Sequence, residues 1–115
     1  MANDNERSGR LLQDLADGDL EGIAPLLQDR VRARKASGLD AEAFQLAEIV
    51  ALAAVDASPI FWFVHLGLQP SVELEKIVGT LIAAAPIIGM PRVVSAAGNI
   101  VGVTEIAEEQ ADDAP

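Results

Sequence analysis

The sequence predicts an all-α fold, an antiparallel bundle of about six helices. Apolar residues recur at spacings of three and four along most of the chain, and no segment shows the alternation of a convincing β-strand. Acidic or serine N-caps and glycine or proline breaks separate these segments. Half of the residues are apolar but only 3% are aromatic. The interior must therefore consist mainly of Ala, Val, Leu and Ile, and small side chains let helices approach closely.

The amino-terminal third is expected to hold two helices. Residues 6–16 form a short first helix, and a second helix, capped by Asp19, runs to about Lys35 before Gly38 ends it. The apolar residues of this second helix follow helical spacing and are predicted to form a buried stripe. They are Leu20, Ile23, Leu26, Leu27 and Val31.

A third helix is expected over residues 41–57, with Asp40 as its N-cap. It is apolar on more than one face, so little of its surface can face water. Ser58 and Pro59 are an N-cap and first-turn pair, which begins a fourth helix.

Two further helices complete the predicted bundle. Ser71 caps a fifth helix that ends at Gly89, because glycine commonly terminates a helix. Pro91 then opens a sixth helix, which is expected to end near Val103.

Length limits the chain to one domain, since 115 residues leave no room for a second core. This domain comprises amino-terminal helices over 1–38, a helical core over 39–103 and an acidic tail over 104–115. The tail holds five acids and no base and is predicted to be disordered. Several helices are apolar on more than one face, so the chain is also expected to self-associate.

The formal net charge of −10 argues against a nucleic-acid or anionic-membrane partner, because phosphates would be repelled. One basic cluster complements the dipole at a helix end: Arg30, Arg32, Arg34 and Lys35. The apolar segments 49–68 and 77–94 are interrupted by ionisable residues and prolines, which favours soluble core and subunit interface over membrane spans. The amino terminus lacks the pattern of a targeting signal, so a cytoplasmic location is expected.

The segment from Glu48 to Asn99 reads EIVALAAVDASPIFWFVH and then GLQPSVELEKIVGTLIAAAPIIGMPRVVSAAGN. It resembles the carboxymuconolactone decarboxylase and alkylhydroperoxidase-D-like family. The resemblance covers about half of the chain strongly. It implies an alkylhydroperoxidase-D-like fold and a homo-oligomer, commonly a trimer or hexamer, assembled through the helices that match residues 40–100.

The peroxidase branch of this family carries a Cys-x-x-Cys-x-x-x-His motif. With His65 as the anchor, the two cysteines fall on Ser58 and Phe61, and the chain contains no cysteine. Thiol peroxidase activity is therefore not expected, since it needs a sulfur that ionises and is oxidised. Seven residues separate Ser58 from His65, which is too far for a nucleophile and its base, so Ser58 is interpreted as a cap.

In the same branch the histidine takes part in a proton relay with an upstream glutamate, whose place here is occupied by Leu46. Glu48 lies two residues further on, a rotation of roughly 200° around the helix. It is not expected to take over the role, and the relay is predicted to be incomplete.

In the decarboxylase branch the resemblance implies a cofactor-free reaction in which a histidine acts as acid or base on a lactone acid. His65 is the candidate catalytic residue. Arg92, in the GMPRVV turn, is the candidate cation for a substrate carboxylate, and Trp62, one turn before His65, is the candidate pocket wall. Each also has a structural interpretation, as a hydrogen-bonded helix histidine, a subunit-contact arginine and a packing tryptophan.

Two functions stay open at this point. The first is a carboxymuconolactone-decarboxylase-like lyase, without metal or other cofactor, that acts on a small carboxylated or cyclic metabolite and so binds a small anion. One histidine and scattered carboxylates offer no metal-ligand spacing. The second is a non-catalytic, ligand-binding or structural homo-oligomer on the same scaffold.

Overall fold

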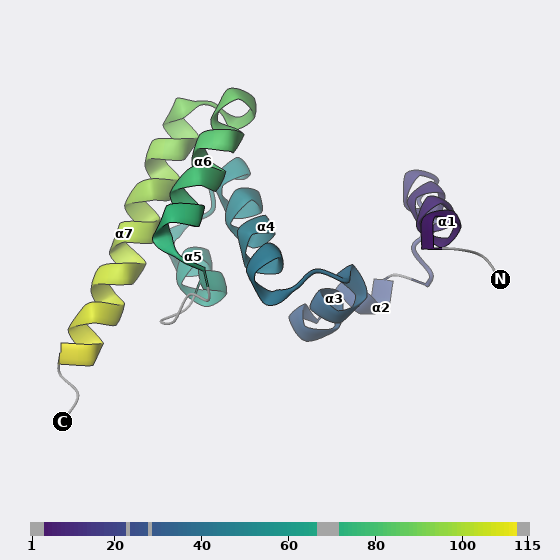
Figure 1. Cartoon of the computed structure of the whole chain (residues 1–115), viewed down its shortest axis with the longest axis horizontal. Coiled ribbons are helices and arrows are strands. Elements are labelled where there is room, and N and C mark those ends of the chain that lie inside the picture. Colours follow the sequence, from purple (N-terminus) through teal and green to yellow (C-terminus); the bar gives the residue numbers. More distant parts are fainter. Residues whose placement is uncertain (1–3, 23, 28, 67–71, 113–115) are drawn as a thin grey trace. The chain divides into compact units, whose positions relative to one another are not determined.

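A computed structural model describes residues 4–22, 24–27, 29–66 and 72–112. All regular structure in these residues is helical, which confirms the all-α prediction (Figure 1). The described residues form seven helical segments, α1 to α7, of which α2 is a single turn. The chain divides into two compact units, residues 1–38 (unit 1) and residues 39–115 (unit 2).

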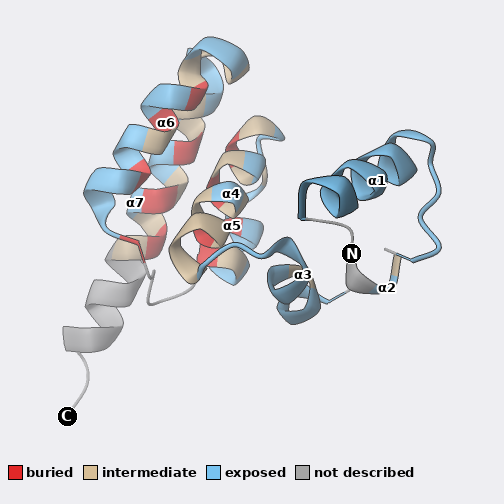
Figure 2. Cartoon of the chain, turned by 45° about the vertical axis from the view of Figure 1, so that its right-hand side comes forward, coloured by how far each residue is buried: buried red, intermediate tan, exposed pale blue. Residues whose placement is uncertain are grey.

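Unit 1 contains α1 (Asp4–Ala16), α2 (Ala24–Leu27) and α3 (Arg30–Ser37). No residue of α1 or α3 is buried, and Figure 2 shows no buried colour on either helix. Gly38 ends α3 with a left-handed φ of 70°, as the sequence predicted.

The second predicted helix, from Asp19 to about Lys35, is instead divided into α2 and α3. Pro25 lacks an amide hydrogen and is accommodated in the single turn of α2. Asp29 then has an extended backbone, and its carboxylate accepts hydrogen bonds from the amides of Val31 and Arg32. An N-cap of this kind starts a new helix, so one continuous helix is not formed.

The buried apolar stripe expected along this segment is also not observed among its described side chains. Leu20 is 41% exposed and Val31 is 63% exposed. Ile23 and the side chains of Leu26 and Leu27 lie outside the described residues. Unit 1 therefore has no apolar core of its own among the described side chains.

The described residues of unit 2 form four helices, α4 (Ala41–Ala54), α5 (Pro59–Leu66), α6 (Leu74–Ile88) and α7 (Met90–Asp112). α4 packs against the other three, and α7 also packs against α5 and α6. Figure 1 shows α6 and α7 side by side as a helical hairpin, joined at Gly89. Gly89 has a φ of 89°, a conformation that favours glycine.

Local sequence signals place most of these boundaries. The Asp40 carboxylate accepts a hydrogen bond of 2.8 Å from the amide of Ala43, which confirms the predicted N-cap of α4. α5 begins at Pro59, the predicted first-turn proline. Ser71, the predicted cap of α6, lies outside the described residues.

α4 ends at Ala54, three residues before the predicted boundary. The amide of Ala57 donates to the carbonyl of Leu52 at 3.0 Å, and Asp56 adopts a left-handed φ of 50°. This is the hydrogen-bond pattern of a helix that ends in a left-handed residue. The chain has turned by Ala57, where the apolar pattern alone suggested more helix.

α7 continues to Asp112, nine residues beyond the predicted end near Val103. The segment expected as the start of a disordered tail is thus helical up to Asp112. Between Thr104 and Asp112 the sequence has no Gly or Pro and is rich in Ala, Glu and Gln. These residues have high helix propensity, which outweighs the mutual repulsion of the acids.

The apolar core of unit 2 lies between its four helices, and Figure 2 shows the buried residues on their facing sides. Ile49 of α4, Trp62 of α5 and Ile77 of α6 are the largest side chains that are fully buried. α7 contributes Ala96, Ile100 and Val103. Small and branched side chains therefore fill most of this interior around one tryptophan.

A polar contact at the surface also links two helices of unit 2. Lys76 donates a hydrogen bond of 2.6 Å to the Glu42 carboxylate, which links α6 to α4 and raises the pKa of Lys76 above its ordinary value.

In the part of the chain that the structure describes, no helix is both long and apolar enough to cross a bilayer.

Replacement of Ile77 by Ala should destabilise unit 2 by about 2–5 kcal/mol, because a core cavity remains where the side chain was 1% exposed. Ile87→Ala on the same helix is a matched control, since Ile87 is 88% exposed, and its effect should stay within about 0.5 kcal/mol. Urea unfolding followed by circular dichroism measures both. Equal losses in the two variants would contradict this packing.

Candidate functional site

The sole histidine of the chain, His65, is paired with a carboxylate. Its Nδ1 atom lies 2.9 Å from Oε2 of Glu48, across the crossing of α5 and α4. The side chain of Glu48 is only 13% exposed, whereas that of His65 is 35% exposed. The carboxylate is therefore largely sheltered from water, and the imidazole is partly accessible.

The packing of the two helices produces this pair. Glu48 directly precedes Ile49, and His65 directly precedes Leu66. Ile49 and Leu66 are 1% and 3% exposed and belong to the same core cluster. Consecutive residues of a helix are rotated by about 100°, so both polar side chains lie beside the buried contact of α4 with α5.

The Glu48–His65 pair opens on a pocket of about 240 Å³. Its other walls are the apolar side chains of Ala51 and Leu52 of α4 and of Val55, the C-cap residue that follows this helix. Glu48 and these three residues are spaced by three and four positions, so they share one face of the helix. The pocket thus has a polar end made by the pair and apolar walls made by the last turns of α4 and its C-cap residue.

The pairing also fixes which imidazole nitrogen carries the hydrogen. An ionised carboxylate only accepts hydrogen bonds, so Nδ1 of His65 is the donor to Glu48. In the neutral ring, Nε2 then holds the free lone pair and is the atom that can take a proton. The arrangement is that of a general base whose orientation is set by a carboxylate.

The end of α4 that carries Val55 is tied to α7. The Ser95 hydroxyl of α7 donates a hydrogen bond of 2.8 Å to the carboxylate of Asp56, the residue with the left-handed backbone. The contact of Asp56 with Ser95 joins the turn after α4 to α7. It anchors the turn between α4 and α5 next to the pocket.

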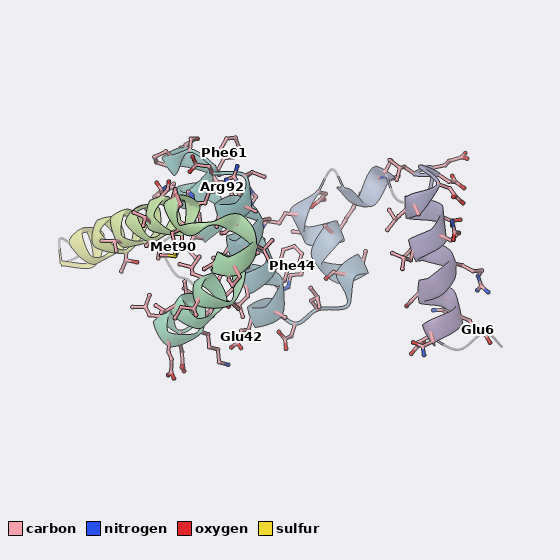
Figure 3. All side chains as sticks on the ribbon, turned by 90° about the horizontal axis from the view of Figure 1, so that it is seen from above. Glu6, Glu42, Phe44, Phe61, Met90 and Arg92 are labelled. Carbon is pink, nitrogen blue, oxygen red and sulfur yellow. The ribbon has the colours of Figure 1, made fainter. Side chains whose placement is uncertain are left out.

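The structure does not gather the residues that the sequence suggested for one site. His65 lines the pocket, whereas Trp62 is 1% exposed and packs in the core. Arg92 lies in the first turn of α7 with an exposed side chain and is not among the lining residues (Figure 3). Ser58 is exposed just before α5.

Glu48, which the sequence analysis set aside as a partner of His65, is the residue that contacts His65. The sequence analysis did not expect Glu48 to contact His65, because its side chain is rotated by roughly 200° from the position of Leu46 on the helix. The hydrogen bond between Glu48 and His65 shows that this expectation was wrong. Leu46 is half-buried against the core, so its face of α4 is used for packing. The different face that carries Glu48 lies toward His65 where α4 and α5 cross. A signal was present, because Glu48 is the only acid between residues 43 and 55, an otherwise apolar stretch with one Gln.

Comparisons with known proteins do not extend this description. No protein-family model, curated protein or solved structure matches the chain. Among the described residues, no three His, Asp or Glu side chains are grouped so that they could hold a metal ion. The chemistry of the site is therefore derived from the Glu48–His65 pair and its pocket.

Replacement of Glu48 by Leu should change the tautomer of His65. With Glu48 present, the neutral ring carries its hydrogen on Nδ1, whereas a histidine free in water favours Nε2. Imidazole ¹⁵N chemical shifts at alkaline pH measure the two forms. Glu75→Leu, at an exposed acid in the first turn of α6, is the control and should leave the tautomer as it is. A wild-type ring with its hydrogen on Nε2 would contradict the pairing.

Proposed function

We propose that the chain is a cofactor-free proton-transfer enzyme of the carboxymuconolactone-decarboxylase-like type, acting on a small carboxylated or cyclic metabolite. The observation that carries the proposal is the pairing of His65 with the sheltered Glu48 carboxylate at an apolar pocket. The proposal includes the alkylhydroperoxidase-D-like fold and a homo-oligomer, a trimer or hexamer. An all-helical unit with His65 on α5 is compatible with both.

Glu48 and His65 have different roles in the proposed reaction. The neutral His65 ring removes a proton from the carbon next to a substrate carbonyl through Nε2 and becomes an imidazolium. Glu48 holds Nδ1–H throughout and stabilises the positive charge that develops on the ring. The same imidazolium then returns the proton to the substrate, so the enzyme ends unchanged.

The pocket sets the size of the substrate. At about 240 Å³ it is smaller than the pockets of about 300–1,000 Å³ that bind drug-sized ligands, so a single ring or a short chain fits it best. Ala51, Leu52 and Val55 can cover the apolar part of such a molecule. Removal of water from this side also strengthens the interactions of the ring with its carboxylate.

The wild-type protein should accelerate exchange of the α-protons of a small cyclic ketone with D₂O. Suitable probes are cyclohexanone and 3-oxocyclohexanecarboxylate, followed by ¹H NMR. His65→Gln should lower the rate by about 10²–10⁴-fold, the usual contribution of a positioned acid or base, and Glu48→Gln by a smaller factor. Lys76→Gln, on α6 and outside the pocket, is the control and should exchange as the wild type does.

Two results would count against proton transfer at His65. One is exchange with both ketones at the rate of buffer alone. The other is a His65→Gln variant with unchanged exchange but a clearly lower melting temperature. A histidine that only supports packing loses stability when its hydrogen bond is removed, by roughly 1–3 kcal/mol.

A second candidate function, a non-catalytic homo-oligomer on the same scaffold, is supported by apolar residues that one subunit leaves exposed. On α6, Leu74, Val78 and Ile82 form a stripe at intervals of four residues and are 56%, 54% and 67% exposed. On α7, Val94 and Val101 are 66% and 54% exposed. Burial of such stripes between subunits is favourable, and it supports self-association in either function.

Sedimentation velocity at micromolar concentration should give a mass of at least two subunits. Ile82→Glu should shift the protein toward monomer, because it places a charge in the exposed stripe of α6. Ala83→Glu is the matched control, since Ala83 is also exposed but lies about 100° further around the helix. A wild-type protein that sediments as a monomer would exclude both the oligomer and this interface.

A further inference from the structure

We infer that the pocket beside His65 binds an uncharged ligand, a small cyclic molecule with one carbonyl group, in preference to a carboxylate. The inference rests on the proposed function and narrows it, since that function admits both carboxylated and cyclic metabolites. It departs from the anionic ligand that the sequence suggested. The reason lies in the charges around the pocket.

Among the described lining residues, the pocket has a carboxylate and no Lys or Arg that could balance the charge of an anionic ligand. Its polar end is the Glu48 carboxylate with the imidazole that this carboxylate already holds. Among the described residues, no Lys or Arg lines it. A ligand carboxylate beside His65 would lie close to Glu48, where like charges repel more strongly than in bulk water.

Unit 2 has two basic residues that could serve such a ligand, Lys76 and Arg92. Lys76 is engaged with Glu42 at 2.6 Å. Arg92 is exposed at the start of α7 and is not among the residues that line the pocket. Neither residue is in place to bind a carboxylate at His65.

The pocket walls favour a ligand with an apolar body. Ala51, Leu52 and Val55 offer no hydrogen-bonding side chain, so a second polar group on the ligand would lose its water without a partner there. The single polar end suits one carbonyl group, with the carbon beside it near Nε2 of His65. A ring ketone or lactone without a carboxylate has this distribution of polar and apolar atoms.

Two ketones with the same ring test the inference on the full chain. Cyclohexanone and 3-oxocyclohexanecarboxylate are each titrated into protein with ¹³C-labelled methyl groups. Cyclohexanone should shift the methyl signals of Ala51, Leu52 and Val55 and should bind at least tenfold more tightly than the carboxylate. Val55→Phe, at a residue that is 73% exposed, should fill the pocket and weaken cyclohexanone at least tenfold. Ile87→Phe, at an exposed residue of α6 outside the pocket, should change its affinity less than twofold.

Equal or tighter binding of the carboxylate would overturn the inference and would mean that a cation reaches the pocket from outside unit 2. Absence of methyl shifts with both ligands at millimolar concentration would overturn it as well. Proton exchange in the same samples separates this inference from the proposed function. If cyclohexanone binds more tightly but proton exchange does not depend on His65, the inference about the ligand holds and the proposed enzyme activity is wrong. If exchange depends on His65 but the carboxylate binds more tightly, the proposed activity holds and the inference about the ligand is wrong.

Discussion

The hydrogen bond between His65 and Glu48 depends on the burial of the two apolar residues that follow them in sequence. Ile49 and Leu66 are held in one core cluster, and each fixes the rotation of its helix. A rotation that buries these residues also brings Glu48 and His65 to 2.9 Å. The same face of α4 continues through Ala51 and Leu52 to the C-cap residue Val55, so the packing that forms the pair also forms the pocket. Site and core are therefore parts of one helix contact.

Local signals were sufficient for much of the fold. The Asp40 cap, the start of α5 at Pro59 and the glycine ends at Gly38 and Gly89 each depend on residues near the boundary itself. The apolar pattern failed where a competing local signal overrode it. Asp29 starts a new helix within a run of helical spacing, and α4 stops where the backbone becomes left-handed at Asp56.

The site was predictable only in part. His65 is the only histidine, so the sequence identified it without structural help. The partner of His65 depends on how α4 and α5 cross. Residue spacing taken from a family motif does not contain this crossing geometry, so the sequence analysis rejected Glu48. Trp62 shares its helix with His65, but it packs in the core, as large aromatic residues commonly do. Arg92 comes from the first turn of α7, and its sequence position carried no information about its distance from the pocket.

A double-mutant cycle between Glu48 and His65 tests the central claim most directly. Glu48→Ala, His65→Ala and the double variant are unfolded in urea, and their free energies of unfolding are compared with that of the wild type. The coupling energy should be about 1–3 kcal/mol, as for a hydrogen bond to a charged and sheltered partner. Single-variant effects that add to within about 0.3 kcal/mol would show that the two side chains do not interact.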